Sequence, residues 1–129
     1  MREILFKAKR KYNDEWVQGL YATGQRSNGE IMHMIITENQ QSFFVIRETI
    51  GQYTGLTDKN GTKIFEGDIV NCRSYSGLRD FNNRVVNWDE FFLSFKTENN
   101  ALYGDGGLEY EIVGNIHDNP ELLEVKENA

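Results

Sequence analysis

The sequence predicts a mainly β protein, either a small partly open β-barrel or a sandwich of short antiparallel strands. Apolar and polar residues alternate in several short runs that turn signals separate. Asn60-Gly61 stands between two such runs, and this dipeptide strongly indicates a β-hairpin because both residues tolerate positive φ. The chain has 12 glycines and one proline, a balance that suits turns between strands better than a helical bundle.

The first half of the chain contains four predicted strands that form two antiparallel hairpins. Their residues alternate with period two or are rich in β-branched and aromatic side chains. The polar stretch 24–30 is expected to be a turn between the hairpins. A helix over 45–50 is an alternative, because short apolar runs are ambiguous. The predicted strands are residues 3–9, 16–21, 31–37 and 42–46.

Residues 53–70 predict a strand, a hairpin turn, a strand, a second turn and a third strand. Asn60 and Gly61 form the first turn. In the second turn, Gly67 takes a backbone conformation closed to other residues, and Asp68 can accept hydrogen bonds from nearby amides. We therefore assign structural roles to these four residues. A calcium-binding loop that starts at Asp58 is disfavoured, because the alternating oxygen donors of such a loop are not continued.

The second half predicts a strand continuing to residue 75, an aromatic hairpin, a last strand and a short helical turn that begins at Pro120. The hairpin joins residues 84–88 and 91–95 through a two-residue turn, Asp89-Glu90. Polar segments over 76–83 and 97–107 are expected to be loops, and the last strand covers 110–116. No linker divides the chain, so we expect a single domain over residues 1–129.

The charge balance disfavours binding to nucleic acid. The formal net charge is −6, whereas proteins that bind duplexes gain affinity by neutralising phosphates with Lys and Arg. Four cations do cluster near the start of the chain, at Lys7, Lys9, Arg10 and Lys11. This cluster is either a solvated strand end or a docking patch for an acidic partner, such as the acidic end of a second copy.

The sequence gives no indication of a secreted or membrane protein. Cys72 is the one cysteine, which suits a reducing compartment, and we expect it to fill space in the core. No segment approaches the roughly 18 apolar residues that a membrane span needs, and no signal peptide begins the sequence. We expect a cytoplasmic protein with no membrane partner.

Neither a catalytic constellation nor a metal or cofactor site can be argued from the residues. The two histidines, His33 and His117, are far apart, and with one cysteine they do not have the spacing of a zinc site. His33 lies among apolar residues and is expected to be a satisfied, partly buried side chain. We therefore expect no enzymatic activity and no cofactor.

Aromatic side chains offer the best candidate for a binding surface. Trp88, Phe91 and Phe92 flank the predicted aromatic hairpin, and aromatics on a sheet face can anchor a partner or stack on bases. Together with the basic residues Lys9 and Arg10 they form the candidate binding surface.

An ordered set of motifs resembles the YopX family of phage and prophage proteins. These motifs are the strand Arg2–Ala8, the block from Gln52-Tyr53-Thr54-Gly55-Leu56 through Asp58-Lys59-Asn60-Gly61 to Ile64–Val70, and the ending Ile112–Leu123. The resemblance spans the chain but is weak over residues 24–47 and 73–107. Family members often carry a tryptophan soon after the first strand, whereas this chain has Lys9 there and Trp16 later. The resemblance implies a small β-rich cytoplasmic protein of unknown biochemical role and supplies no catalytic residues.

Taken together, these features predict a phage- or prophage-encoded, non-enzymatic binding or assembly module that acts through protein contacts. Its partner would be a second copy of itself, as a homo-oligomer, or a host or phage protein. The alternative is a small nucleic-acid-binding barrel used in phage replication or transcription control, which the net charge disfavours. That alternative predicts that the basic side chains gather on one face with exposed aromatics.

Overall fold

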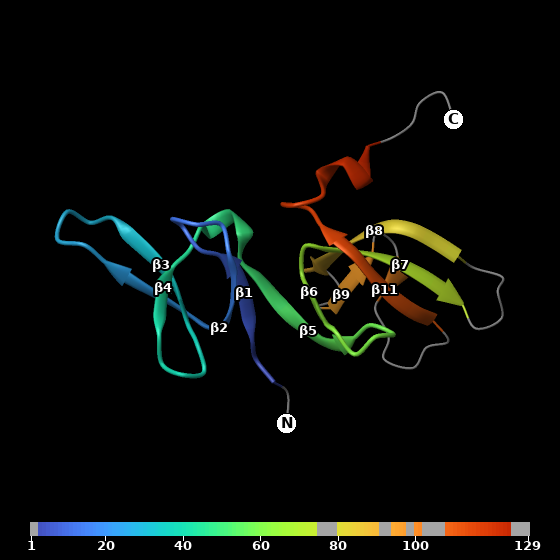
Figure 1. Cartoon of the computed structure of the whole chain (residues 1–129), viewed down its shortest axis with the longest axis horizontal. Coiled ribbons are helices and arrows are strands. Elements are labelled where there is room, and N and C mark those ends of the chain that lie inside the picture. The colour runs from blue at the N-terminus through green and yellow to red at the C-terminus, as the bar shows by residue number, and fades with distance from the viewer. Residues whose placement is uncertain (1–2, 75–79, 91–93, 98–99, 102–107, 125–129) are drawn as a thin grey trace. The chain divides into compact units, whose positions relative to one another are not determined.

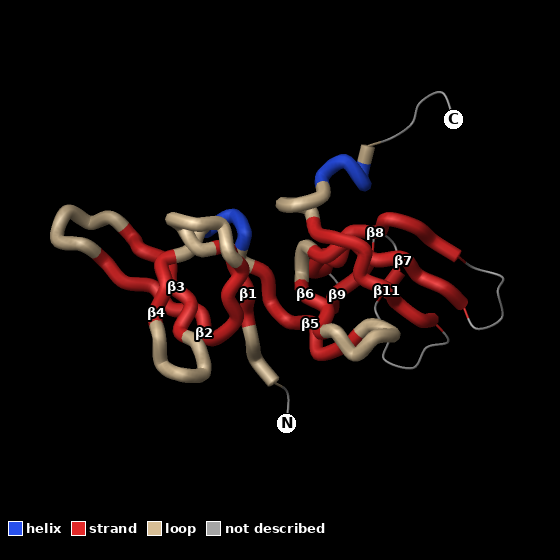
Figure 2. The backbone as a smooth tube through the Cα atoms, in the orientation of Figure 1, coloured by secondary structure: helices blue, strands red, loops and turns tan. Residues whose placement is uncertain are grey.

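The structure is a computed structural model that describes residues 3–74, 80–90, 94–97, 100–101 and 108–124. Within these residues the chain is antiparallel β-sheet with two short 3-10 helices (Figure 1, Figure 2). The predicted mainly β class and short C-terminal helical turn are both confirmed. No helix in the described part is long and apolar enough to cross a membrane. The chain divides into two compact units, Met1–Tyr53 and Thr54–Ala129.

The first unit is built from two antiparallel hairpins, as predicted. Neighbouring strands are hydrogen-bonded in the order β4-β3-β2-β1. A bridge between Arg10 and Val45 then links the segment after β4 to the end of β1. The alternative helix over 45–50 is reduced to the 3-10 turn η1 (Arg47–Thr49). The strands are β1 (Phe6–Lys9), β2 (Trp16–Gln25), β3 (Ile31–Ile36) and β4 (Ser42–Phe44).

The core of the first unit lies on one face of these strands. Ala8, Ile35 and Val45 are buried there, and partly buried apolar residues, Phe6, Val17 and Ile50 among them, pack around them. Alternation along β1 places Phe6 and Ala8 on the face of the core and Lys7 and Lys9 on the other face. The predicted period-two pattern therefore determines which face of the strand is buried.

Strand β5 (Gly51–Thr57) begins in the first unit and continues into the second. Gly51 and Gln52 pair with β1, and the strand then pairs with β6 (Lys63–Phe65). The predicted hairpin is present, and five residues, 58–62, separate its two strands. Gly61 has φ +83°, and its N–H donates to the carbonyl of Asp58. Asp58 itself closes the loop, because its backbone N–H donates to the carbonyl of Thr62.

The second unit contains a five-stranded antiparallel sheet in the order β10-β9-β8-β7-β11. The named strands of both sheets follow open orders, with the Arg10–Val45 bridge outside them, which agrees with the predicted partly open barrel or sandwich. The core cluster of the second unit consists of five buried residues, Ile64, Val70, Cys72, Val86 and Tyr110. The elements are β7 (Asp68–Ser74), β8 (Asp80–Asp89), β9 (Ser94–Thr97), β10 (Asn100–Ala101), β11 (Leu108–Asn115) and η2 (Pro120–Leu123).

The aromatic hairpin is present with a longer turn than predicted. Trp88 pairs with Phe95 and Asp89 pairs with Ser94, so four residues rather than two separate the paired strands. Phe91 and Phe92 fall in this segment and lie outside the described residues. Two segments predicted to be loops contain strand residues. β8 begins at Asp80, inside 76–83, and β10 falls inside 97–107.

Candidate functional site

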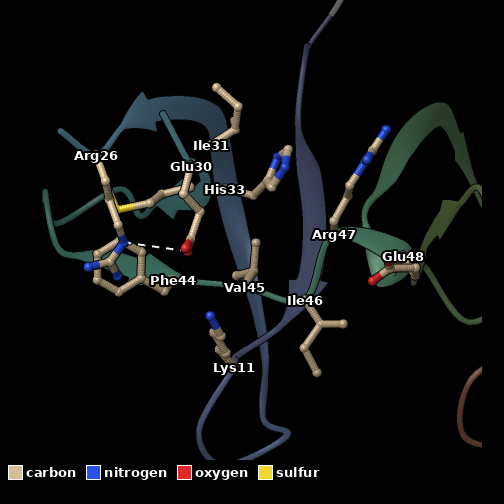
Figure 3. A pocket seen from close by; sticks show the side chains of 11 residues that line it. Lys11, Arg26, Glu30, Ile31, His33, Phe44, Val45, Ile46, Arg47 and Glu48 are labelled. Atoms are coloured by element: carbon tan, nitrogen blue, oxygen red, sulfur yellow. Dashed lines mark ion pairs between the residues drawn. The ribbon is translucent and has the colours of Figure 1, made fainter. Parts of the chain in front are cut away.

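A groove of about 240 Å³ opens in the first unit, beside β3 and the segment that follows β4 (Figure 3). Its lining combines apolar side chains with charges of both signs. The apolar residues are Ile31, Met32, Phe44, Val45 and Ile46, and the polar ones are Lys11, Arg26, Glu30, His33, Arg47 and Glu48. Such a mixture suits contact with a protein segment that carries both apolar and charged side chains.

An ion pair spans the β2–β3 turn at one end of the groove. The Nε atom of Arg26 lies 3.5 Å from a carboxylate oxygen of Glu30, and the two backbones are joined by the N–H of Arg26 and the carbonyl of Glu30 (Figure 3). Both side chains are about half exposed, so water screens the pair and it contributes little to stability. Its effect is to keep this end of the groove electrically neutral.

His33 is held by a neighbouring tyrosine. The Tyr21 hydroxyl lies 2.6 Å from His33 Nδ1, and the two rings stack with their centroids 5.9 Å apart. The histidine is partly buried, as expected for a satisfied side chain. His117 belongs to the other unit, where its backbone N–H donates to Asn115 Oδ1. Among the described residues, no group of three or more His, Cys, Asp or Glu could hold a metal ion.

The predicted binding residues Lys9 and Arg10 lie on the segment that backs the groove. The carbonyl of Lys9 accepts the N–H of Ile46, and Arg10 forms the bridge to Val45. Their side chains cover aromatic rings of the same unit. The Nζ of Lys9 is 5.8 Å from the Trp16 ring, and the guanidinium of Arg10 is 4.2 Å from the Phe43 ring.

Trp88 lies in the second unit and is partly anchored. It is 40% exposed, and its ring meets the buried ring of Phe95 edge-on at 5.0 Å. One side of the indole is therefore packed and the other can contact a partner. The structure brings Lys9 and Arg10 together, and it places Trp88 in a different unit.

The four predicted turn residues hold hairpins of the second unit together. The N–H of Asn60 donates to Asp58 Oδ1, and Gly61 takes its positive φ beside it. Gly67 has φ +93° and donates its N–H to the carbonyl of Val86. The buried carboxylate of Asp68 accepts the N–H of Phe65 at 2.8 Å, which closes the turn between β6 and β7.

Asp58 has a structural role that the sequence patterns did not indicate. Its Oδ1 accepts the N–H groups of Asn60 and Thr62, and its Oδ2 accepts the N–H of Ile112 on β11. Burial alone would raise the pKa of this carboxyl group, but the three N–H groups and the nearby Lys59 outweigh burial and lower the pKa below its ordinary value. Asp at the first position of a four-residue turn, as in Asp58-Lys59-Asn60-Gly61, is the signal that could have identified it.

Cys72 is buried in the core of the second unit, as predicted. Burial raises the pKa of its thiol, although a hydrogen bond with Thr97 and the charges of Arg84 and Arg73 act in the opposite direction. The thiolate, which is the reactive form, is therefore disfavoured.

The sequence matches the family described as YopX protein over residues 5–124. Among solved structures, it is similar to that of protein EF1440 from Enterococcus faecalis, with 28% identity and a TM-score of 0.55. The similarity covers 96% of this chain and 100% of that one. No curated protein matches the sequence.

Proposed function

Since the chain belongs to the YopX family, we propose that it is a phage- or prophage-encoded binding or assembly module of the cytoplasm, which acts through protein contacts and catalyses no reaction. The phage origin follows the resemblance of its motifs to that family. The contact-based role follows from the distribution of apolar side chains described next.

The observation that carries the proposal is the concentration of exposed apolar side chains on the first unit. Eight large apolar side chains of the described residues are exposed, and four of them belong to β2, β3 and β4: Leu20, Tyr21, Ile31 and Phe44. Ile31 and Phe44 also line the groove. Exposed apolar side chains gathered beside polar residues are typical of protein-interaction sites.

The charges of this region support a protein partner. The groove is lined by three cations and two anions, and the whole chain carries −6. A surface that binds nucleic acid normally presents a clear excess of cations to the phosphates. A mixed lining favours a partner that also carries both signs.

One cluster favours the alternative role in nucleic-acid binding. The Nζ atoms of Lys7 and Lys9 lie 4.9 and 5.8 Å from the Trp16 ring, so two cations flank one partly exposed aromatic. A base could stack on such an aromatic while the lysines contact phosphates. Two other cations are engaged elsewhere, since Arg26 pairs with Glu30 and Arg73, in the second unit, bonds to Asn82.

Size-exclusion chromatography with light scattering, run with and without single-stranded DNA or RNA, separates the two roles. The proposal predicts an assembled species whose mass does not change when nucleic acid is added. A monomer that shifts on adding nucleic acid and returns at high salt would overturn it, and would assign the function to the Lys7–Trp16–Lys9 cluster.

A further inference from the structure

Strand β2 has one edge along which no described strand pairs over its last six positions. β2 pairs with β1 only from Trp16 to Gly19, and with β3 only from Leu20 to Gln25. Its second half therefore has a strand on one side alone, and the β2–β3 hairpin extends beyond the rest of the first unit (Figure 1). We call the outward side of residues 20–25 the open edge.

The hydrogen-bond pattern identifies the backbone groups on the open edge. The N–H of Arg26 donates to the carbonyl of Glu30 at 2.8 Å, which makes these two residues a hydrogen-bonded pair. Such pairs recur at every second residue of an antiparallel ladder, so Leu20, Ala22 and Gly24 bond to β3. The N–H and C=O groups of Tyr21, Thr23 and Gln25 consequently point outward.

Two other strand edges of the described residues, those of β6 and β11, are blocked in part. The N–H of Phe65 on the edge strand β6 is taken by Asp68. On the edge of β11, the carbonyl of Tyr110 and the N–H of Ile112 are taken by Lys59 and Asp58. The open edge lacks two common protections, because the sequence Leu-Tyr-Ala-Thr-Gly-Gln contains no charge and no proline.

We propose that the open edge pairs with the open edge of a second copy of this chain, antiparallel and about a two-fold axis at Thr23. This inference rests on the proposed assembly role and specifies its contact surface. In that register Thr23 faces Thr23, and Tyr21 faces Gln25 of the other copy. All six outward backbone groups of each copy then find partners, because the three outward residues are symmetric about Thr23.

The neutral sequence of the open edge allows a second copy as the occupant despite the net charge. Two chains that each carry −6 repel one another, and this repulsion is least where the contacting segments are uncharged. The apolar side chains Leu20 and Tyr21 of β2 itself, 59% and 37% exposed, would lose contact with water against the paired strand. A two-stranded ribbon that entered a DNA groove would instead need cations, and the turn of this hairpin carries the neutral Arg26–Glu30 pair.

The first test removes one outward N–H without touching the ladder to β3. Thr23→Pro deletes the central donor of the open edge, and proline is tolerated where the N–H faces away from the sheet. Thr23→Val keeps this N–H and is the matched control. We expect Thr23→Val to assemble as the wild type does, and the mass of Thr23→Pro to fall about twofold in light scattering if the assembly is a dimer. Far-ultraviolet circular dichroism and the melting temperature verify that both variants are folded.

The second test does not depend on proline being tolerated. Thr23→Cys places two thiols across the axis, where the Cα atoms of a hydrogen-bonded pair lie about 5.5 Å apart, within disulfide range. Ser27→Cys, on the exposed turn of the same hairpin, is the control. Mild oxidation should yield covalent dimers of Thr23→Cys, and neither of Ser27→Cys nor of the wild type, whose Cys72 is buried.

The results distinguish this inference from the assembly role itself. A wild type that assembles, together with a folded Thr23→Pro that assembles equally and a Thr23→Cys that does not cross-link, would overturn the open-edge contact and leave the assembly role standing. A wild type that is monomeric and whose Thr23→Cys does not cross-link would overturn the contact. If that monomer also binds nucleic acid, the assembly role falls as well.

Discussion

Asp58 joins two parts of the second unit that lie 54 positions apart in the sequence. One carboxylate oxygen organises the β5–β6 loop, and the other fixes Ile112 on β11. The sequence identified the hairpin turn through Asn60-Gly61, because turn residues act locally. It could not show the bond to Ile112, since the partner of a side chain across the sheet depends on how the strands are arranged.

The variant Asp58→Asn tests this role. The amide keeps the shape of the side chain, but one of its two ends is a donor, so at least one buried N–H loses its acceptor. We expect the free energy of unfolding to fall by about 1–3 kcal/mol, measured by chemical denaturation at neutral pH. Glu38→Gln, an exposed acid in the β3–β4 turn, is the control and should change little.

The pH dependence of stability gives a second test of Asp58. Because its pKa is lower in the folded chain, the stability it contributes is present above the unfolded pKa of about 4 and is lost as the pH falls through the lower folded pKa. The free energy of unfolding of the wild type should therefore decline more steeply below pH 4 than that of Asp58→Asn. Parallel curves for the two proteins over pH 5 to 2.5 would contradict this assignment.

Strand β2 shows where sequence patterns fall short at the level of an element. The β-prone residues 16–21 correctly predicted a strand, but the strand continues to Gln25 through Ala22 and Gly24, which have weak β propensity. Pairing with the apolar strand β3 imposes this extension, and the extension creates the open edge. The turn after it was predicted, because Gly29 supplies the positive φ that a hairpin loop needs.

Two glycines in β2 make a matched pair for testing the strand's geometry. A Cβ built on Gly19 would overlap the carbonyl oxygen of Ile36 and lie 2.7 Å from its carbonyl carbon, and backbone cannot move aside easily. A Cβ on Gly24 would meet only the flexible ends of Met32 and Met34, at 3.2 and 3.5 Å. We expect Gly19→Ala to destabilise the chain by about 1–3 kcal/mol or more, and Gly24→Ala to change stability by less than 1 kcal/mol in thermal and chemical unfolding. Equal effects would contradict the described register of β2 and β3.

At the scale of the whole molecule, the family and the mainly β class could be predicted from sequence, whereas the division into two compact units could not. No linker marks the boundary, because it falls inside the continuous strand β5, between Tyr53 and Thr54. The binding surface was predicted around Trp88 and the basic residues. The contact surface proposed from the structure lies instead on the β2–β3 hairpin, whose exposure depends on which strands pair.

The expectation of a single domain over 1–129 makes a thermodynamic prediction. Each unit has its own core, with Ile35 fully buried in the first and Ile64 in the second. If the chain unfolds as one domain, calorimetry should show one common transition. Ile35→Ala and Ile64→Ala should each lower the free energy of unfolding of that transition by about 2–5 kcal/mol. Two transitions, each moved by only one of the variants, would instead show two domains.

Residue-resolved hydrogen exchange of the β2 amides, followed over a range of protein concentrations, tests most directly whether this chain acts through backbone pairing of copies. The account predicts that the amides of Tyr21, Thr23 and Gln25 exchange fast in dilute protein and become protected as the concentration rises. The amides of Leu20, Ala22 and Gly24, which bond to β3, should stay protected throughout and serve as an internal reference. Fast exchange at Tyr21, Thr23 and Gln25 at concentrations where light scattering shows assembly would contradict the account.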